Sequence, residues 1–164
     1  MLTIRPAGPD DAEIILALIR ELAEYEREPD AVRATAEDII RYGFGDRPTF
    51  HCLMCLWDGA PAGFALYFYT YSTWEGKPGI FLEDIFIRPE YRRHGIGKAV
   101  MIRLAEIAVR EGCARFEWNV LDWNTPAVRF YESLGGYHLS EWLPYRMDPE
   151  DVKNLAEQGG SLEK

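Results

Sequence analysis

Glycines and basic side chains stand close together in residues 92–98, which read Arg-Arg-His-Gly-Ile-Gly-Lys. Glycine lets a backbone come close to a ligand, and the first N–H groups of a helix bind anions because they lack intrahelical acceptors. A helical pattern begins within this segment and runs to residue 110. The segment therefore predicts a diphosphate site. A glycine-rich helix start whose basic side chains are simply solvated would give the same sequence pattern. The residues expected to hold the diphosphate are Arg92, Arg93, His94, Gly95, Ile96, Gly97 and Lys98.

Two other phosphate-binding loops fit these residues less well. A Walker loop has glycine at its first position and Ser or Thr after its lysine, whereas here Arg92 holds the first position and Ala99 follows Lys98. A dinucleotide-binding loop directly follows the first strand of its domain, whereas residues 89–94 separate this one from a later strand. Glu117 lies near the distance expected of a ribose-binding carboxylate, so this second alternative stays open.

Two adjacent carboxylates, Glu83 and Asp84, interrupt an otherwise apolar strand pattern over residues 80–87. Burying an unpaired charge is costly, so each carboxylate needs a partner. The partner is either structural, such as an arginine or a backbone N–H, or a bound amine. Because adjacent strand residues point to opposite faces, one carboxylate can face a ligand while the other is structural. We favour Glu83 as the functional one.

A carboxylate in such a place serves amine chemistry. A lysine-type ammonium has a pKa of ~10.4, so only a small fraction of it is the nucleophilic free base at pH 7. A carboxylate binds the ammonium and accepts its proton, directly or through water.

Charge and composition exclude several other classes of protein. The chain has 164 residues and a formal net charge of −9. Nucleic-acid binding draws on clustered positive charge, whereas a negative field attracts amines, although solubility alone would also account for the charge. No apolar run approaches the ~20 residues that cross a bilayer, and the N-terminus lacks a signal-peptide layout. We therefore expect a cytoplasmic protein with no membrane or nucleic-acid partner.

Metal binding is not expected. Cys52 and Cys55 have C-x-x-C spacing but lie in a strand-like run, where positions three apart point to opposite faces, and no second pair completes a zinc site. With Cys113 the cysteine count is odd, which predicts free thiols in a chain without a secretory signal. The three histidines are scattered.

Hydrophobic periodicity, turn residues and helix caps predict alternating strands and helices. Strands are expected over residues 3–5, 50–57, 62–71, 80–87, 115–121 and 137–146, and helices over 9–27, 35–42, 96–110, 125–134 and from 148 onward. Gly43 is expected to end the second helix, Asp58-Gly59 to turn a hairpin, and residues 74–79 to form a loop. This order gives one α/β domain over residues 1–158, with residues 159–164 as a frayed tail.

The sequence resembles the GNAT superfamily of N-acetyltransferases. The coenzyme A loop of that superfamily reads R-x-x-G-x-G or R-x-x-G-x-A and follows a central strand. Residues 92–97 match that loop. Other stretches look like the diamine acetyltransferase branch, which contains spermidine/spermine and thialysine acetyltransferases. These stretches are Tyr-Ser-Thr-Trp (71–74), Leu-Glu-Asp-Ile-Phe-Ile (82–87), Pro-Glu-Tyr-Arg (89–92), Leu-Asp-Trp-Asn (121–124) and Phe-Tyr (130–131). The likeness runs from about residue 4 to residue 146.

The resemblance implies a fold, a donor and an assembly: a single-domain α/β fold with a mixed, twisted central sheet flanked by helices, acetyl-coenzyme A as donor, and a homodimer. Arg93 departs from close relatives, which often have glycine there, but its N–H remains and binding should survive. The further coenzyme-lining residues that the resemblance implies are Ile85, Phe86, Ile87, Asn124 and Ala127.

The resemblance also places a general acid at Tyr131. The leaving thiolate must be reprotonated, and since a thiol pKa of ~8.5 lies below the ~10 of tyrosine, geometry must help the transfer. An aromatic core pair with Phe130 is the structural alternative. The residues implied to line the amine pocket are Tyr25, Glu26, Trp74, Glu83, Asp84 and Glu141.

The stretch Tyr71-Ser72-Thr73-Trp74 bears on the choice of amine. Polyamine-acetylating relatives read Tyr-Asp-Pro-Trp there, so this chain lacks a carboxylate that would anchor a distal ammonium. We therefore favour a small lysine-like acceptor of the thialysine type, acetylated directly in a ternary complex because no cysteine is placed for a covalent relay. The alternatives are a polyamine acceptor, a protein N-terminus or lysine, and a non-catalytic acetyl-coenzyme A sensor.

Overall fold

The computed structural model describes residues 1–161 and divides the chain into two compact units. The first unit is Met1–Asn119 and the second begins at Val120. Every strand of the sheet lies in the first unit.

Five strands form one mixed sheet in the order of the chain. They are β1 (Leu2–Pro6), β2 (His51–Trp57), β3 (Ala60–Ser72), β4 (Lys77–Ile87) and β5 (Arg115–Trp118). The first four pair antiparallel and β5 pairs parallel to β4. The β2–β3 hairpin turns at Asp58 and Gly59, whose φ angles of 49° and 83° suit the twist of a two-residue turn. The predicted α/β fold with a mixed sheet is thus confirmed.

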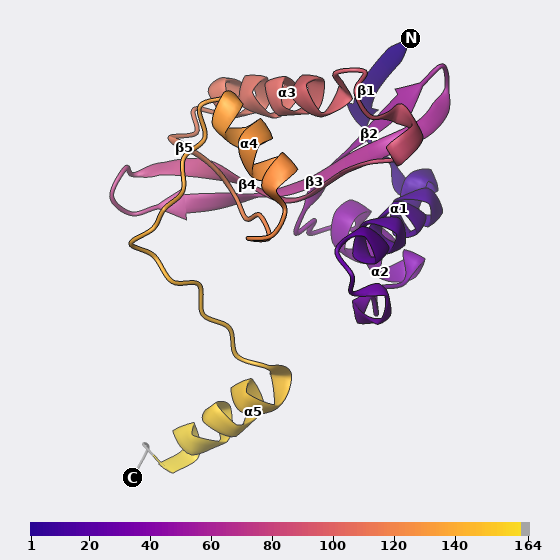
Figure 1. Cartoon of the computed structure of the whole chain (residues 1–164). Coiled ribbons are helices and arrows are strands. Elements are labelled where there is room, and N and C mark those ends of the chain that lie inside the picture. The colour runs from indigo at the N-terminus through magenta and orange to yellow at the C-terminus, as the bar shows by residue number, and fades with distance from the viewer. Residues whose placement is uncertain (162–164) are drawn as a thin grey trace. The chain divides into compact units, whose positions relative to one another are not determined.

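Helices cover both faces of the sheet (Figure 1). Helices α1 (Ala12–Tyr25) and α2 (Ala36–Phe44) lie on one face and α3 (Ile96–Arg110) on the other. Ile15 and Leu18 of α1 are fully buried and share a cluster with Met54 and Phe64 of the sheet. Each large side chain buried in this way contributes about 1.5–3 kcal/mol, so the amphipathic pattern of α1 fixes the helix to the sheet.

Helix α2 runs past the glycine that was predicted to end it. The helix continues to Phe44, with Gly43 inside it and Gly45 as its C-cap. A Cβ built at Gly43 would lie only 2.5 Å from Cζ of Phe50. Gly43 therefore makes room for an aromatic ring, which a pattern of single residues does not reveal.

The predicted loop before β4 is shorter than expected, because β4 begins at Lys77 rather than at residue 80. The hydroxyl of the buried Ser72 accepts a hydrogen bond from the N–H of Glu75 at 3.2 Å, and the N–H of Gly76 donates to the carbonyl of Ser72 at 2.8 Å. These bonds close a tight turn, so both strands extend further than hydrophobicity alone indicates.

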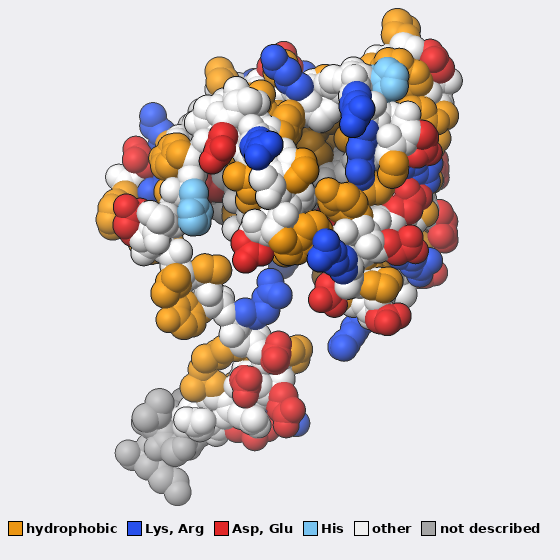
Figure 2. All heavy atoms as spheres, in the orientation of Figure 1, with side chains coloured by type: hydrophobic (Ala, Val, Ile, Leu, Met, Phe, Trp, Pro, Cys, Tyr) orange, Lys and Arg blue, Asp and Glu red, His pale blue; other side chains and the backbone are white. Residues whose placement is uncertain are grey.

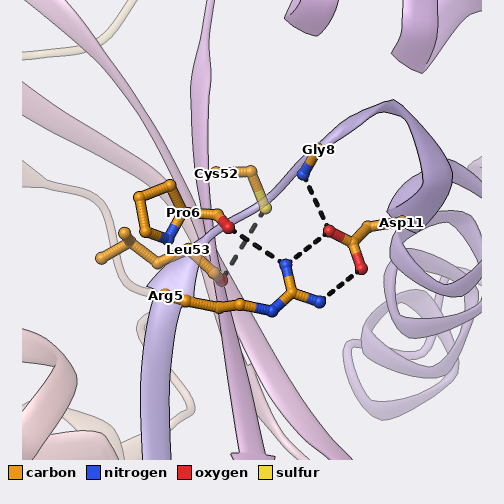
Figure 3. Close-up of polar contacts among 6 residues, drawn as sticks. All are labelled: Arg5, Pro6, Gly8, Asp11, Cys52 and Leu53. Carbon is orange, nitrogen blue, oxygen red and sulfur yellow. Dashed lines mark hydrogen bonds and ion pairs between the residues drawn. The ribbon is translucent and has the colours of Figure 1, made fainter.

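An ion pair fastens β1 to the start of α1 (Figure 3). The Arg5 guanidinium donates to both Asp11 oxygens, at 2.7 and 2.8 Å, and the N–H of Gly8 donates to the same carboxylate at 2.8 Å. The hydrogen bonds from Arg5 hold the pKa of Asp11 below its usual range. Asp11 is also the N-cap residue of α1, so the contact fixes where the helix begins.

The second unit contains α4 (Thr125–Ser133) and α5 (Pro149–Glu157), which follow the predicted helices. The strand predicted over residues 137–146 is wrong, because this segment is irregular. Its apolar side chains are largely exposed, for example Tyr137 and Tyr145, and Pro144 lacks the N–H that a ladder needs. Alternation shows which face a strand would bury but not whether a partner edge is present.

Short 3₁₀ helices complete the described chain: η1 (Pro9–Asp11), η2 (Pro29–Ala31), η3 (Pro89–Tyr91) and η4 (Gln158–Ser161). The predicted frayed tail thus begins with a helical turn, and its residues 162–164 lie outside the described part. Strand β5 ends at Trp118, three residues before its predicted end. None of the helices in residues 1–161 has the length and apolar character needed to span a membrane.

Candidate functional site

The glycine-rich loop leads directly into α3, as the sequence predicts. Gly95 is the N-cap residue with a φ of 76°, and a Cβ there would meet nothing within 4 Å. The N–H of Ala99 donates to the carbonyl of Gly95, so the amides before Ala99 have no acceptor within the helix. The first turn contains no acidic residue. Open space, free amides and the helix dipole together suit an anion such as a diphosphate.

Arg93 occupies the left-handed region without being glycine, with a φ of 65°. This conformation costs a non-glycine residue roughly 1–2 kcal/mol, which explains why glycine suits this position in the resembling family. The side chain is exposed, as is that of Lys98. Both positive charges therefore stay near the loop and accessible to a ligand.

Arg92 and His94 are held by the protein itself. Arg92 Nε donates to the carbonyl of Ile87 at 2.8 Å, and its guanidinium lies 4.8 Å from the ring centroid of Tyr25 and 5.6 Å from that of Phe86. His94 Nδ1 lies 2.9 Å from the Arg92 carbonyl, and its ring packs on Trp57 with centroids 4.9 Å apart. The predicted phosphate role thus rests on the loop amides, Arg93 and Lys98 more than on Arg92.

The parallel pairing of β4 with β5 stops halfway along β4. The last registered pair is Leu82 with Trp118, whereas Ile85, Phe86 and Ile87 are paired only with β3. Within residues 1–161, the other edge of β4 therefore has no strand partner beyond Leu82. Apart from the Ile87 carbonyl, which accepts from Arg92, its main-chain N–H and C=O groups suit an extended ligand that carries amide groups. The resemblance implies that these same residues line the coenzyme.

A β-bulge at Glu83 determines how the two adjacent carboxylates of β4, Glu83 and Asp84, are oriented. Leu66 pairs with Asp84 and Tyr67 with Leu82, so Glu83 is the extra residue without an opposite partner. Cys52 pairs with Leu66 in turn, so Asp84 points to the face that α1 and α2 cover.

Asp84, Glu83 and Glu26 form an acidic cluster in the first unit. Burial, together with the negative charges of Glu83 and Glu26, raises the pKa of Asp84 to about 6. Burial also raises the pKa of Glu26, the residue that follows α1. None of the three forms an ion pair with a residue of the described chain. The cluster therefore favours a cation from outside, and Asp84 can accept a proton near neutral pH.

The remaining predicted residues lie elsewhere in the chain. Trp74 is 85% exposed in the β3–β4 turn. In the second unit, Asn124 caps α4 by accepting from the N–H of Ala127 at 3.4 Å, and the ring of Tyr131 lies 5.3 Å from that of Phe130. Glu141 is exposed in the irregular segment.

Sequence reasoning missed the part played by Arg88. Its guanidinium forms a two-pronged ion pair with Glu21 of α1, with contacts of 2.6 and 2.9 Å, and donates to the carbonyl of Pro61 at 2.8 Å. The partners lie 67 and 27 positions away, so no local spacing could have indicated them. Within residues 1–161, no three or more His, Cys, Asp or Glu side chains are arranged so that they could hold a metal ion.

Comparison with known proteins shows the family of this chain. The sequence matches the acetyltransferase (GNAT) family over residues 15–136. A thialysine N-epsilon-acetyltransferase of Sus scrofa is 43% identical over 164 residues, which cover 93% of this chain and 96% of that protein. A human spermidine/spermine N(1)-acetyltransferase-like protein 1 is 36% identical over 163 residues, which cover 93% of this chain but 23% of that longer protein.

A solved structure supports the same fold. The integron cassette protein of the V. cholerae mobile metagenome superposes with a TM-score of 0.80 at 24% identity, over 94% of this chain and 97% of that one. The family match spans most of the chain and includes β2 to β5, the glycine loop and α4. This chain therefore belongs to the acetyltransferase (GNAT) family, whose members use acetyl-coenzyme A as co-substrate.

Proposed function

We propose that this protein transfers the acetyl group of acetyl-coenzyme A to the side-chain amine of a small lysine-like amino acid. The observation that carries the proposal is the cluster of Glu26, Glu83 and Asp84, which brings three carboxylates together without a positive partner in the described chain. A bound ammonium would supply the missing charge and relieve the repulsion. The 43% identity with a thialysine acetyltransferase over nearly the whole chain supports the same choice of acceptor.

The proposed reaction proceeds in a ternary complex. The amine loses its proton to a carboxylate of the cluster, and its nitrogen then attacks the thioester carbonyl carbon. The carbon–sulfur bond breaks, and Tyr131 donates a proton to the leaving thiolate. The second proton of the attacking nitrogen then returns to Tyr131, directly or through water, which leaves the neutral amide and restores the hydroxyl. A proton acceptor with a pKa near 6 works well at neutral pH, which supports Asp84 beside the predicted Glu83.

The donor is proposed to bind between the glycine loop and the end of β4. The amides at the start of α3, with Arg93 and Lys98, would hold the diphosphate. The edge of β4 at Ile85 to Ile87, which β5 does not reach, would pair with the pantetheine arm. We further propose that the protein works as a homodimer, as the family resemblance implies. We also propose that it works in the cytoplasm without a metal ion, as the residue patterns of the sequence predict.

A screen of amines tests the function. The purified protein is mixed with acetyl-coenzyme A and thialysine, lysine, ornithine, spermidine or spermine, with and without EDTA, and thiol release is followed. We expect thialysine to give the highest kcat/KM and EDTA to have no effect. A higher kcat/KM for spermidine would favour the polyamine alternative, to which the human relative's name points. Absence of thiol release with every amine would contradict enzymatic acetyl transfer to small amines.

The same assay with Tyr131→Phe examines the proposed acid. Removing the hydroxyl should lower kcat at least about tenfold while the Kd for coenzyme A stays the same, because the thiolate forms only during the reaction. Equal kcat values for the variant and the wild type under saturating substrates would assign Tyr131 a packing role beside Phe130 instead.

A further inference from the structure

Two arginines bracket the turn that leads into the glycine loop. Arg88 precedes η3 and Arg92 follows it. Arg88 forms its two-pronged ion pair with Glu21, and the guanidinium of Arg92 lies over the ring of Tyr25. Both partners belong to α1 and are four residues apart, so they lie on the same face of that helix. We call these four residues the arginine clamp.

The clamp joins the two candidate binding regions of the first unit. On one side, Arg92 directly precedes the glycine loop, and its Nε holds the carbonyl of Ile87 at the end of β4. On the other side, Tyr25 is the last residue of α1 and Glu26 of the acidic cluster follows it. The side chain of Arg92 and the ring of Tyr25 therefore form a physical connection between the glycine loop and Glu26.

We infer that Arg92 is a positioning residue that couples donor binding to amine binding, an inference that rests on the proposed function. The element with two states is the last turn of α1, which is either docked on η3 by the clamp or detached from it. Donor binding orders the loop, and Arg92 then favours the docked turn with Glu26 in place. By linkage, an amine bound at Glu26 strengthens donor binding by the same factor.

Arg92 is suited to this part by its chemistry. A planar guanidinium can lie over an aromatic ring and donate from its edge at the same time, whereas a lysine ammonium is a point charge without an Nε–H. Arg92→Lys therefore keeps the positive charge of the loop and removes the link. Tyr25→Leu removes the ring from the other side, and Tyr25→Phe restores it.

Calorimetry measures the coupling without turnover. The Kd of coenzyme A is measured alone and with saturating thialysine, and the Kd of thialysine alone and with saturating coenzyme A. We expect each ligand to tighten the other at least about fivefold in the wild type and in Tyr25→Phe, and less than about twofold in Arg92→Lys and Tyr25→Leu. The coupling is taken as the ratio of the two Kd values of coenzyme A, with and without thialysine, so a general change of donor affinity in a variant does not enter it.

Arg5→Lys is the matched control. Arg5 forms a two-pronged ion pair with Asp11 at the other end of α1 (Figure 3), so its loss perturbs the same helix without touching the clamp. This variant should keep the wild-type coupling. Circular dichroism and thermal unfolding serve to check that every compared variant is folded.

The outcomes separate the coupling from the function on which it rests. Wild-type coupling in Arg92→Lys and Tyr25→Leu, or equal loss of coupling in Arg5→Lys, would overturn the positioning role. Binding of both ligands to the wild type without mutual effect would also overturn it and leave the proposed function intact. A wild type that binds neither coenzyme A nor any amine would overturn the proposed function, and the coupling with it.

Discussion

Asp84 is the residue at which burial and charge combine most directly with the proposed chemistry. The sequence indicated that the Glu83-Asp84 pair needed a partner, because unpaired charge in a core strand is costly. It could not indicate the bulge at Glu83, since that depends on how β3 pairs with β4. It also favoured Glu83, whereas the register directs Asp84 to the face that α1 covers.

The raised pKa of Asp84 predicts a pH dependence of activity and of stability. With a pKa of about 6, Asp84 loses its ability to accept a proton as the pH falls through 6, so kcat/KM should fall there. The folded state binds this proton more tightly than the unfolded state, so the contribution of Asp84 to stability declines as the pH rises from about 4 to 6. Ionised Asp84 at pH 7 therefore destabilises the fold, by at most about 3 kcal/mol.

Asp84→Asn should then inactivate the enzyme and stabilise it. We expect a loss of kcat/KM of at least about tenfold, loss of the acidic limb near pH 6, and a higher free energy of unfolding at pH 7, with a smaller gain at pH 5.5. Urea unfolding and pH–rate profiles provide the measurements, and Glu83→Gln is the matched comparison. If Glu83→Gln removes the limb and Asp84→Asn keeps it, the base is Glu83, as the sequence predicted.

At the scale of elements, prediction succeeded where local chemistry decides and failed where a distant partner decides. The start of α3 at Gly95 and the turn at Asp58-Gly59 follow from glycine and turn preferences alone. Gly43 lies inside α2 rather than at its end, and its missing Cβ makes room for the ring of Phe50, a tertiary contact. The segment over residues 137–146, which was expected to be a strand, is irregular and is not part of the five-stranded sheet.

At the start of α3, the effect of an added negative charge can be measured separately from the effect of an added side chain. Gly95 has a φ of 76° and open space around its missing Cβ, and both Asn and Asp tolerate that conformation. Gly95→Asn and Gly95→Asp differ only in charge. The carboxylate is favourable to the helix dipole but repels a diphosphate. Gly95→Asp should therefore unfold at the same or a higher temperature than Gly95→Asn, yet bind coenzyme A at least about tenfold more weakly at low salt.

Calorimetry and thermal unfolding of the two Gly95 variants decide this point. A parallel loss of affinity and stability in Gly95→Asp would mean that the substitution damages the helix rather than the site. Equal affinities for coenzyme A would place the diphosphate away from the loop amides.

At the scale of the whole molecule, negative charge dominates. The formal net charge is −9, and Asp and Glu side chains are frequent over the region of α1 and α2 in the face shown (Figure 2). Such a field attracts cationic amines and is screened by salt, with a Debye length of about 14 Å near 0.05 M and about 4 Å near 0.5 M. The attraction grows with the charge of the amine. The composition therefore bears on the choice between a polyamine and a lysine-like acceptor.

Salt should consequently change the apparent specificity. Spermidine carries three ammonium groups, whereas thialysine carries two and a carboxylate, so the field acts about three times more strongly on spermidine. Raising the salt from about 0.05 M to about 0.5 M should lower kcat/KM for spermidine at least about threefold more than for thialysine. The preference for thialysine then widens with salt.

The double variant Glu13→Gln/Glu24→Gln, which removes two exposed charges of α1, should flatten the salt dependence for spermidine and leave that for thialysine nearly unchanged. Identical salt dependences for the two amines in the wild type would mean that contacts inside the acidic cluster, rather than the field of the molecule, select the acceptor.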